Sequence, residues 1–261
     1  TYFTVADNGS CMEVARYLDL LREGGQIHEV IHTPNIGKLN AVLKSVIGGN
    51  FPLITVTDAD VLFLNGWQNE TYKVFANFPK TGAVCPTPSS KSFKTHTANI
   101  WFDLFFSKRL HFTPVTNPKA LKMFAASIDN KAFYNDHHLN NYLTVANGNY
   151  KAVVGAGHFV TTYRGSVFSD LSVHYSDYKL GGTSESSLLD IPVVKKGLWR
   201  LSTADNFAYH MGNVEERWMI DMVNNLEQEN KEVEGKSLRN KANSFSFSYL
   251  LKNKIFGKLF S

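Results

Sequence analysis

The sequence contains few cysteines and no long hydrophobic run. Cys11 and Cys85 are the two cysteines among 261 residues, and a pair so far apart in the chain does not make a disulfide framework. No apolar stretch approaches the roughly 20 residues with which a helix crosses a bilayer. The first residues do not resemble a signal peptide. We therefore expect a protein of the reducing cytoplasm.

Acidic residues are missing from the C-terminal segment. Residues 235–261 contain six basic side chains and no acid, so this segment carries +6 while the whole chain carries +4. The other 234 residues therefore sum to −2, and such a body gives no reason to expect a nucleic-acid partner. We divide the chain into a globular domain, 1–234, and a basic tail, 235–261.

The tail has an amphipathic pattern with two open interpretations. Its apolar residues recur every four positions and basic residues lie beside them: Phe247, Leu251, Ile255 and Leu259, with Lys252, Lys254 and Lys258. Such a helix can lie on an anionic membrane, which would give the protein peripheral contact with the inner face. A solvated basic helix packed partly on the domain would show the same pattern.

The first 60 residues alternate short apolar runs with helical periods. Strands are expected at 2–6, 27–31 and 53–57, and helices between them with apolar faces from Val14 to Leu21 and from Leu39 to Val46. Ser10 and Glu13 have the spacing of a capping box for the first helix. Because strands joined by helical crossovers run parallel, we predict an α/β, Rossmann-like fold with a mostly parallel sheet flanked by helices.

The pattern continues less regularly to residue 226. Further strands are predicted at 81–85, 151–154 and 158–163, helices at 120–128, 134–146 and 215–226, and loops at 86–97 and 181–187. We find no internal repeat and no clear linker. One domain is therefore expected before the tail.

Two acids follow the third predicted strand. Asp58 and Asp60 are separated by one residue, so both carboxylates can converge on one hard cation such as Mg²⁺ or Mn²⁺. An ion held there would also bind a diphosphate and make it a better leaving group. The alternative is a turn with solvated acids.

Polar residues also follow the first two predicted strands. Asp7 ends the first strand, where it could accept a hydrogen bond from a base or a ribose, or simply belong to a turn. Asn35 and Lys38 precede a helix, where free N–H groups and a lysine could face phosphate. The alternative is a loop with an ordinary surface lysine, which the segment favours when it is considered by itself.

Two further residues have both a structural and a chemical interpretation. Asp136 opens a predicted helix, where an acid caps the helix or acts as a general base. His210 is either a hydrogen-bonded structural histidine or a metal ligand. The adjacent His137 and His138 point to different helical faces and are poor candidates for one shared metal ion.

The order of these segments resembles the GT-A nucleotide-sugar glycosyltransferases. The chain shows Asp-Asn-Gly-Ser from residue 7, Asn-Ile-Gly-Lys from 35, Thr-Asp-Ala-Asp-Val from 57, Asn-Asp at 135 and His-Met-Gly-Asn from 210. It is most similar to the large bacterial inverting family two, over most of residues 2–213. The resemblance implies transfer of a sugar from a UDP- or GDP-sugar to a saccharide or lipid-linked acceptor, as in polysaccharide biosynthesis at the cell envelope.

The resemblance also implies roles for individual residues. Asp7 would contact the nucleotide base, and Asn35 and Lys38 would lie near the nucleotide. Asp58 and Asp60 would be the DxD acids, with Asp58 reaching ribose or phosphate as well as the Mn²⁺ or Mg²⁺ ion. In the same way His210 would complete the metal site, and Asp136 would be the base in an inverting attack.

The chain departs from the family pattern in two places. Family members have a strand and a helix before the strand that ends at Asp7, so we expect an N-terminally incomplete domain that lacks both. Asn135 replaces the usual glutamate before Asp136. Two other functions stay open. A sugar-1-phosphate nucleotidyltransferase shares the sheet and the metal-binding acids, and loss of the first strand would favour a catalytically inactive GT-A-like binding module.

Overall fold

The structure is a computed structural model that describes residues 1–46, 48–169, 171, 175–177, 184–212, 214–226 and 252–254. The chain forms two compact units. Unit 1 contains Thr1–Ile54 and Gly165–Pro192, and unit 2 contains Thr55–Arg164 and Val193–Ser261. Each unit is described by itself below.

Unit 1 begins with two parallel strands and two helices. Its elements are β1 (Thr4–Asn8), α1 (Met12–Glu23), β2 (Glu29–Thr33), α2 (Lys38–Val46), α7 (Ser166–Ser169) and the π-helical turn η1 (Ser186–Asp190). β1 pairs with β2 in parallel, as predicted, although both strands begin two residues later than expected. The predicted helix face of α2 is confirmed, because Leu39, Leu43 and Val46 are buried.

The predicted capping box of α1 is wrong. The residue at the N-cap is Cys11, and no side chain caps the helix there. The backbone N–H of Ser10 instead donates to Asp7 Oδ1 at 2.9 Å. This hydrogen bond makes Ser10 part of a turn that follows β1, and the helix therefore starts one residue later than a cap at Ser10 would require.

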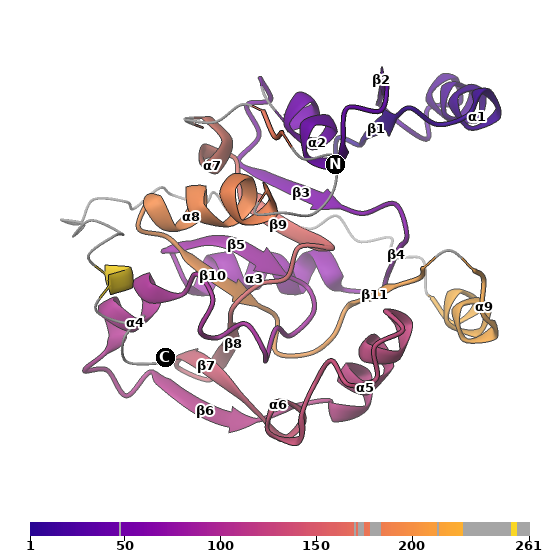
Figure 1. The fold of residues 1–261 in the computed structure, drawn as a ribbon. Helices are drawn as coiled ribbons and strands as arrows, with labels where there is room; N and C mark the ends of the chain where they lie inside the picture. The colour runs from indigo at the N-terminus through magenta and orange to yellow at the C-terminus, as the bar shows by residue number, and fades with distance from the viewer. Residues whose placement is uncertain are drawn as a thin grey trace. The chain divides into compact units, whose positions relative to one another are not determined.

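Unit 2 is built on a seven-stranded mixed sheet (Figure 1). The strand order is β3-β9-β5-β10-β8-β7-β6. The strands are β3 (Leu53–Thr57), which begins in unit 1, β5 (Thr81–Cys85), β6 (Leu110–Pro114), β7 (Asn141–Asn147), β8 (Tyr150–Val154), β9 (Val160–Arg164) and β10 (Trp199–Ser202). The predicted bounds of β3 and β5 are confirmed.

The α/β class is confirmed, but the expectation of a mostly parallel sheet is wrong for these seven strands. β5 and β10 run parallel, whereas the β5–β9, β8–β10, β7–β8 and β6–β7 pairs are antiparallel. Part of the reason is a tight hairpin between β7 and β8, where Gly148 adopts φ 57°. A two-residue hairpin loop requires such left-handed backbone, and it joins strands only in antiparallel orientation.

The helix predicted over 134–146 is also wrong. This segment forms the short helix α6 (Asp136–Asn140) and then β7. Tyr142, Leu143, Thr144 and Val145 are all buried, and since successive side chains of a strand point to opposite faces, both faces of β7 are covered here. A run that is buried on both faces loses the alternation that identifies a strand, and its apolar positions can imitate a helix.

The remaining elements of unit 2 surround the sheet. They are β4 (Val61–Phe63), α3 (Trp67–Asn77), α4 (Ala98–Leu104), α5 (Pro118–Ser127), β11 (Ala208–His210) and α9 (Arg217–Asn224), while α8 (Ile191–Lys195) crosses the unit boundary. The helices predicted over 120–128 and 215–226 correspond to α5 and α9. β4 and β11 form a separate antiparallel pair.

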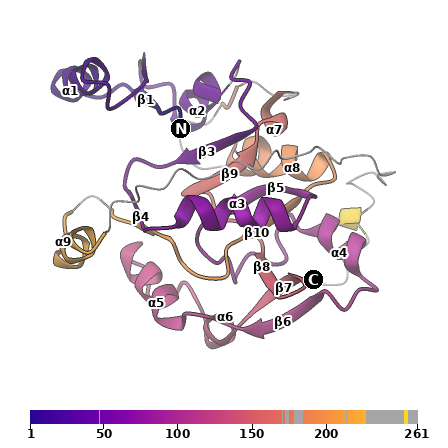
Figure 2. The same cartoon turned by 180° about the vertical axis from the view of Figure 1, so that it is seen from behind.

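One apolar cluster in unit 2 joins α5, α6, β7 and β11. Its buried members are Val115, Ala120, Leu121, Phe124, Ala125, Tyr134, Tyr142, Val153 and Tyr209. Leu139 of α6 and Phe159, just before β9, pack against it. Figure 2 shows α5 and α6 at the same end of the sheet. The cluster therefore fixes the short helix α6 relative to β11.

Several predictions concern residues that are largely outside the described ranges. Of the tail at 235–261, the structure describes residues 252–254. Residues 181–183 of the predicted loop at 181–187 are also outside, while residues 184–187 are helical. No helix in the described part of the chain combines the length and the apolar character that a membrane crossing requires.

Candidate metal centre

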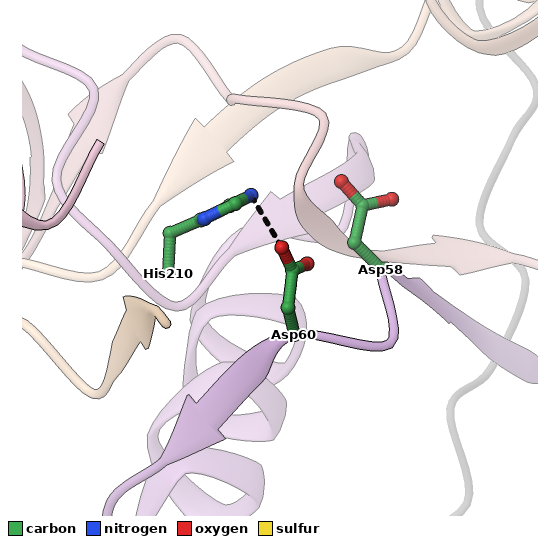
Figure 3. A group of neighbouring side chains, drawn as sticks. All are labelled: Asp58, Asp60 and His210. Atoms are coloured by element: carbon green, nitrogen blue, oxygen red, sulfur yellow. Dashed lines mark ion pairs between the residues drawn. The ribbon is translucent and has the colours of Figure 1, made fainter. Parts of the chain in front are cut away.

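Asp58, Asp60 and His210 come together in unit 2 (Figure 3). One ligand atom from each side chain lies within 4.8 Å of the other two. His210 Nε2 is 3.3 Å from Asp60 Oδ2, and Asp58 stands beside Asp60 on the same loop. Among the described residues, this is the one group of three or more His, Cys, Asp or Glu side chains with such geometry.

Two backbone pairings bring these side chains together. The N–H of Asp58 donates to the Phe159 carbonyl at 2.8 Å, which ties the end of β3 to the start of β9. In the β4–β11 pair, His210 lies opposite Val61, and the Met211 N–H donates to the Asp60 carbonyl at 2.7 Å. His210 is 150 positions from Asp60 in the sequence, so only this pairing places it at the acids.

A backbone hydrogen bond orients the His210 ring. The Gly212 N–H donates to Nδ1 at 3.2 Å, so the neutral ring carries its proton on Nε2, the atom that faces Asp60. A cation at Nε2 would replace that proton, and the proton of the neutral ring would then move to Nδ1. The hydrogen bond from Gly212 must therefore rearrange when an ion binds.

The donor set suits a divalent cation. Two carboxylates and one imidazole supply oxygen and nitrogen ligands, which Mn²⁺ accepts, and Mg²⁺ also prefers carboxylate oxygens. The side chains of His210 and Asp60 are 25% and 31% exposed, so an ion there would be reachable from solvent. Three protein ligands would leave coordination positions for water or phosphate oxygens. The residues predicted as metal ligands thus lie together, and binding itself stays a prediction.

Asp136 belongs to the same unit and to the same packed framework. It is the first residue of α6, and its side chain is exposed. The N-cap of this helix is Asn135, whose Oδ1 accepts from the His138 N–H at 2.9 Å. Leu139 packs against the apolar cluster that contains Tyr209, the neighbour of His210. One core therefore supports both the predicted base and a predicted metal ligand.

The two histidines that follow Asp136 have separate environments. The His137 ring lies 5.6 Å from the Phe112 ring, measured between centroids. Burial lowers the pKa of His138, and the neighbouring His137 and Lys91 lower it further. His138 is therefore expected to be neutral near pH 7. The centroids of the His137 and His138 rings are 6.2 Å apart.

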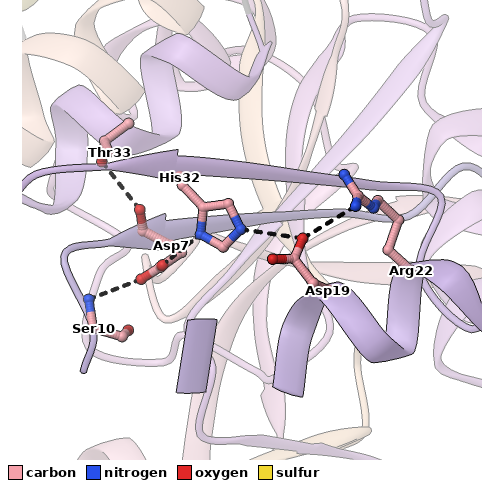
Figure 4. A network of polar contacts seen from close by, with 6 residues as sticks. All are labelled: Asp7, Ser10, Asp19, Arg22, His32 and Thr33. Carbon is pink, nitrogen blue, oxygen red and sulfur yellow. Dashed lines mark hydrogen bonds and ion pairs between the residues drawn. The ribbon is translucent and has the colours of Figure 1, made fainter. Parts of the chain in front are cut away.

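Asp7 lies in unit 1, where it anchors a polar network (Figure 4). It is 6% exposed, and β1–β2 pairing places it opposite His32. Asp7 Oδ1 accepts from the Ser10 N–H, while Oδ2 is 2.7 Å from His32 Nδ1. His32 Nε2 reaches Asp19 of α1 at 3.4 Å, and Asp19 pairs with Arg22.

The network shifts the pKa values of both central groups. Hydrogen bonds from Ser10 and then His32 lower the pKa of Asp7, against the opposing effect of burial. The hydrogen bond to Asp7, followed by that to Asp19, raises the pKa of His32. Both carboxylate oxygens of Asp7 are already engaged, so a nucleotide base would have to share them. Sequence reasoning missed His32, although parallel pairing of the two strands would have indicated it.

Asn35 and Lys38 follow β2 in the same unit. A Cβ on Gly9, which has φ 83°, would lie 2.7 Å from the Asn35 backbone nitrogen, so the turns after β1 and β2 touch. Asn8 Oδ1 also accepts from the Ile36 N–H at 2.9 Å. Asn35 is exposed, and Lys38 Nζ is 3.6 Å from a Glu185 carboxylate oxygen.

Sequence reasoning also missed Asn40, which holds this loop. It is buried in α2, where Nδ2 donates to the carbonyls of Ile36 and Ser176 and Oδ1 accepts from the Ser176 N–H. An asparagine within a helical period carries no distinctive sequence signal, because Ser176, to which it makes two of its three hydrogen bonds, lies on a distant segment.

The predicted residues thus fall into two groups, with Asp7, Asn35 and Lys38 in unit 1 and the other four in unit 2. No protein-family model and no curated protein matches this chain. A function must therefore be argued from the side chains and their chemistry.

Proposed function

We propose that the chain is a metal-dependent glycosyltransferase of the GT-A type. It would transfer a sugar from a UDP- or GDP-sugar to a saccharide or a lipid-linked acceptor. The observation that carries this proposal is the convergence of Asp58, Asp60 and His210 at the end of β3. Three ligands from two distant segments would leave coordination positions for phosphate oxygens, which suits binding of a nucleoside diphosphate through an ion.

The chemistry divides between the acids of this group and Asp136. A bound Mn²⁺ or Mg²⁺ supplies positive charge that stabilises the departing diphosphate. Asp58 and Asp60 would orient the donor through that ion. Asp136 would accept the proton of the acceptor hydroxyl as its oxygen bonds to the anomeric carbon and the bond from that carbon to the diphosphate breaks. Attack from the side opposite the leaving group gives inversion.

The position of Asp136 supports its role as a base. Its carboxylate is exposed, so an acceptor hydroxyl can approach it, and it stands at the start of a helix that is packed on the core through Leu139. A rigidly held base transfers a proton more efficiently because little reorganisation is needed. Asp136→Asn should therefore abolish transfer to an acceptor while metal and donor binding remain.

Calorimetry with UDP- and GDP-sugars, with and without Mn²⁺, tests the proposal. We expect donor binding that depends on Mn²⁺, and Mn²⁺ affinity at least tenfold lower in Asp60→Asn and His210→Gln, since each loses a ligand atom. Asp221→Asn, which changes an exposed acid on α9, is the matched control and should bind Mn²⁺ normally. Metal-independent donor binding, or equal Mn²⁺ affinity in all variants, would contradict the proposal.

Product analysis separates the two other functions considered above. A glycosyltransferase releases UDP or GDP from the donor, whereas a sugar-1-phosphate nucleotidyltransferase releases pyrophosphate from a nucleoside triphosphate. An inactive binding module would bind the donor and release neither product.

A further inference from the structure

Exposed aromatic side chains gather at the end of α4. Phe102 is 37% exposed, Phe105 is 55% exposed and Phe106, two residues after the helix, is 97% exposed. The rings of Phe105 and Phe106 meet edge to face, with centroids 5.0 Å apart. We call these last two residues the phenylalanine ridge. Adjacent large apolar side chains on a surface are typical of sites that contact a partner or a membrane.

Two cations follow this ridge in the sequence. Lys108 and Arg109 come directly after Ser107 and are both exposed. Asp103 is the one acid in the sequence from 98 to 109, and its Oδ2 already accepts from Lys80 at 3.0 Å and from Trp199 Nε1 at 2.7 Å. The charge that remains available to a partner beside the ridge is therefore cationic.

The described part of the tail lies next to the same helix, α4. Residues 252–254 lie beside α4 in both views (Figures 1 and 2). Lys252 is 3% exposed, with Nζ 5.0 Å from the centroid of the Phe102 ring, so it does not face solvent or membrane as its place in the tail pattern suggested. Lys254 is exposed. Packing of Lys252 on Phe102 thus brings a tail cation close to the ridge.

We propose that this face of unit 2 docks on an anionic phospholipid surface. The phenylalanine ridge would enter the interface between headgroups and acyl chains, while Lys108, Arg109 and Lys254 contact the anionic headgroups. Protruding aromatic rings with flanking cations match the two attractions of such a surface, burial of apolar area and electrostatic attraction to acidic lipids. This inference goes beyond the transfer reaction and does not depend on it.

Vesicle co-sedimentation of the full chain tests the docking. Wild type should bind vesicles of phosphatidylcholine with phosphatidylglycerol, and bind pure phosphatidylcholine much more weakly. Phe105→Ser with Phe106→Ser should lower the partition coefficient at least tenfold, because each lost ring removes apolar area that the interface would bury. Both residues are exposed, so these changes should leave the thermal midpoint unchanged.

Charge variants separate the two attractions. Lys108→Ser with Arg109→Ser should weaken binding to the anionic vesicles about 25-fold, since each cation near such a surface contributes a factor of about five. Lys119→Ser with Lys122→Ser removes two exposed cations from α5 and is the matched control, with no change expected. Equal losses in the two double variants would show that net charge alone matters, and would overturn the docking face.

Insertion has its own readout. Brominated lipids should quench the tryptophan fluorescence of the Phe106→Trp variant more strongly than that of the wild type, which contains only the native tryptophans. Unchanged vesicle binding after loss of the ridge, or no binding by wild type, would overturn the proposal, as would self-association that depends on Phe105 and Phe106. Mn²⁺ affinity should be normal in every variant, so failure of this proposal can be distinguished from failure of the proposed function.

Discussion

Asn40 makes a prediction that follows directly from the geometry of unit 1. Its amide donates to the carbonyls of Ile36 and Ser176 at 2.8 and 2.9 Å, and its oxygen accepts from the Ser176 N–H at 2.7 Å. Asn40 is 6% exposed, so water replaces these bonds poorly. Asn40→Ala should therefore destabilise the loop after β2 and the whole folded chain.

The size of the effect can be worked out from these three bonds. A neutral hydrogen bond contributes about 1 kcal/mol net, so their loss should lower the free energy of unfolding by about 3 kcal/mol. A change of that size corresponds to roughly 6–12 °C in the thermal midpoint of a chain of this length. Asn40→Asp should also destabilise, because it keeps the acceptor for Ser176 but turns a carboxylate oxygen toward two carbonyl oxygens.

Urea denaturation followed by far-UV circular dichroism measures the difference. Asn225→Ala is the matched control, because Asn225 donates one exposed hydrogen bond to a carbonyl on its own helix, that of Asp221. The control should change the unfolding free energy by less than about 0.5 kcal/mol. If Asn40→Ala falls within the same margin of wild type, the three bonds do not hold the loop and the reasoning is wrong.

Three further predictions concern other sites. Because the pKa of His32 lies above its ordinary 6.5 and that of Asp7 below its ordinary 3.8, their ion pair stabilises fully between these two values. The stabilisation by His32 is lost as the pH rises through its raised pKa. In urea titrations at several pH values, the free energy of unfolding of His32→Gln should therefore fall less above pH 6.5 than that of wild type. An equal fall with pH in both proteins would refute the pairing. Tyr142→Phe should cost about 1–3 kcal/mol in the same assay, because the Tyr142 hydroxyl donates to the Ala204 carbonyl at 2.9 Å in a buried position, whereas exposed Tyr17→Phe should cost almost nothing. Cys11 is exposed, while burial raises the pKa of Cys85, so a thiol reagent should modify one cysteine in the native chain and two in denaturant; two fast native reactions would contradict the buried position.

Much of the N-terminal organisation follows from local pattern. The apolar periods of α2 and the short apolar runs of β3 and β5 predict those elements because each depends on contacts that repeat along a single segment. The two acids after β3 were identified in the same way, since a polar pair directly after a buried strand is visible in the sequence. Their pairing with His210 was expected only from family resemblance, because no local pattern links residues 150 positions apart.

Strand direction and partners depended on tertiary structure. The apolar residues of β7 have spacing that also fits a helix, and their burial between β6 and β8 decided in favour of a strand. The seven-stranded sheet is mostly antiparallel, and β6, β7 and β8 contribute two of its antiparallel pairs. The helical crossovers of the first 60 residues gave no indication of these pairs.

The sequence by itself therefore determined the α/β class, the apolar face of α2 and the residue types that could hold a cation. Tertiary structure decided which of those residues meet: β4–β11 pairing brings His210 to Asp60, and β1–β2 pairing brings His32 to Asp7. It also decided that Lys252 packs on Phe102. The physical reason is that hydrogen bonding between strands and burial of distant side chains are cooperative and long-range, whereas local propensity acts over a few residues.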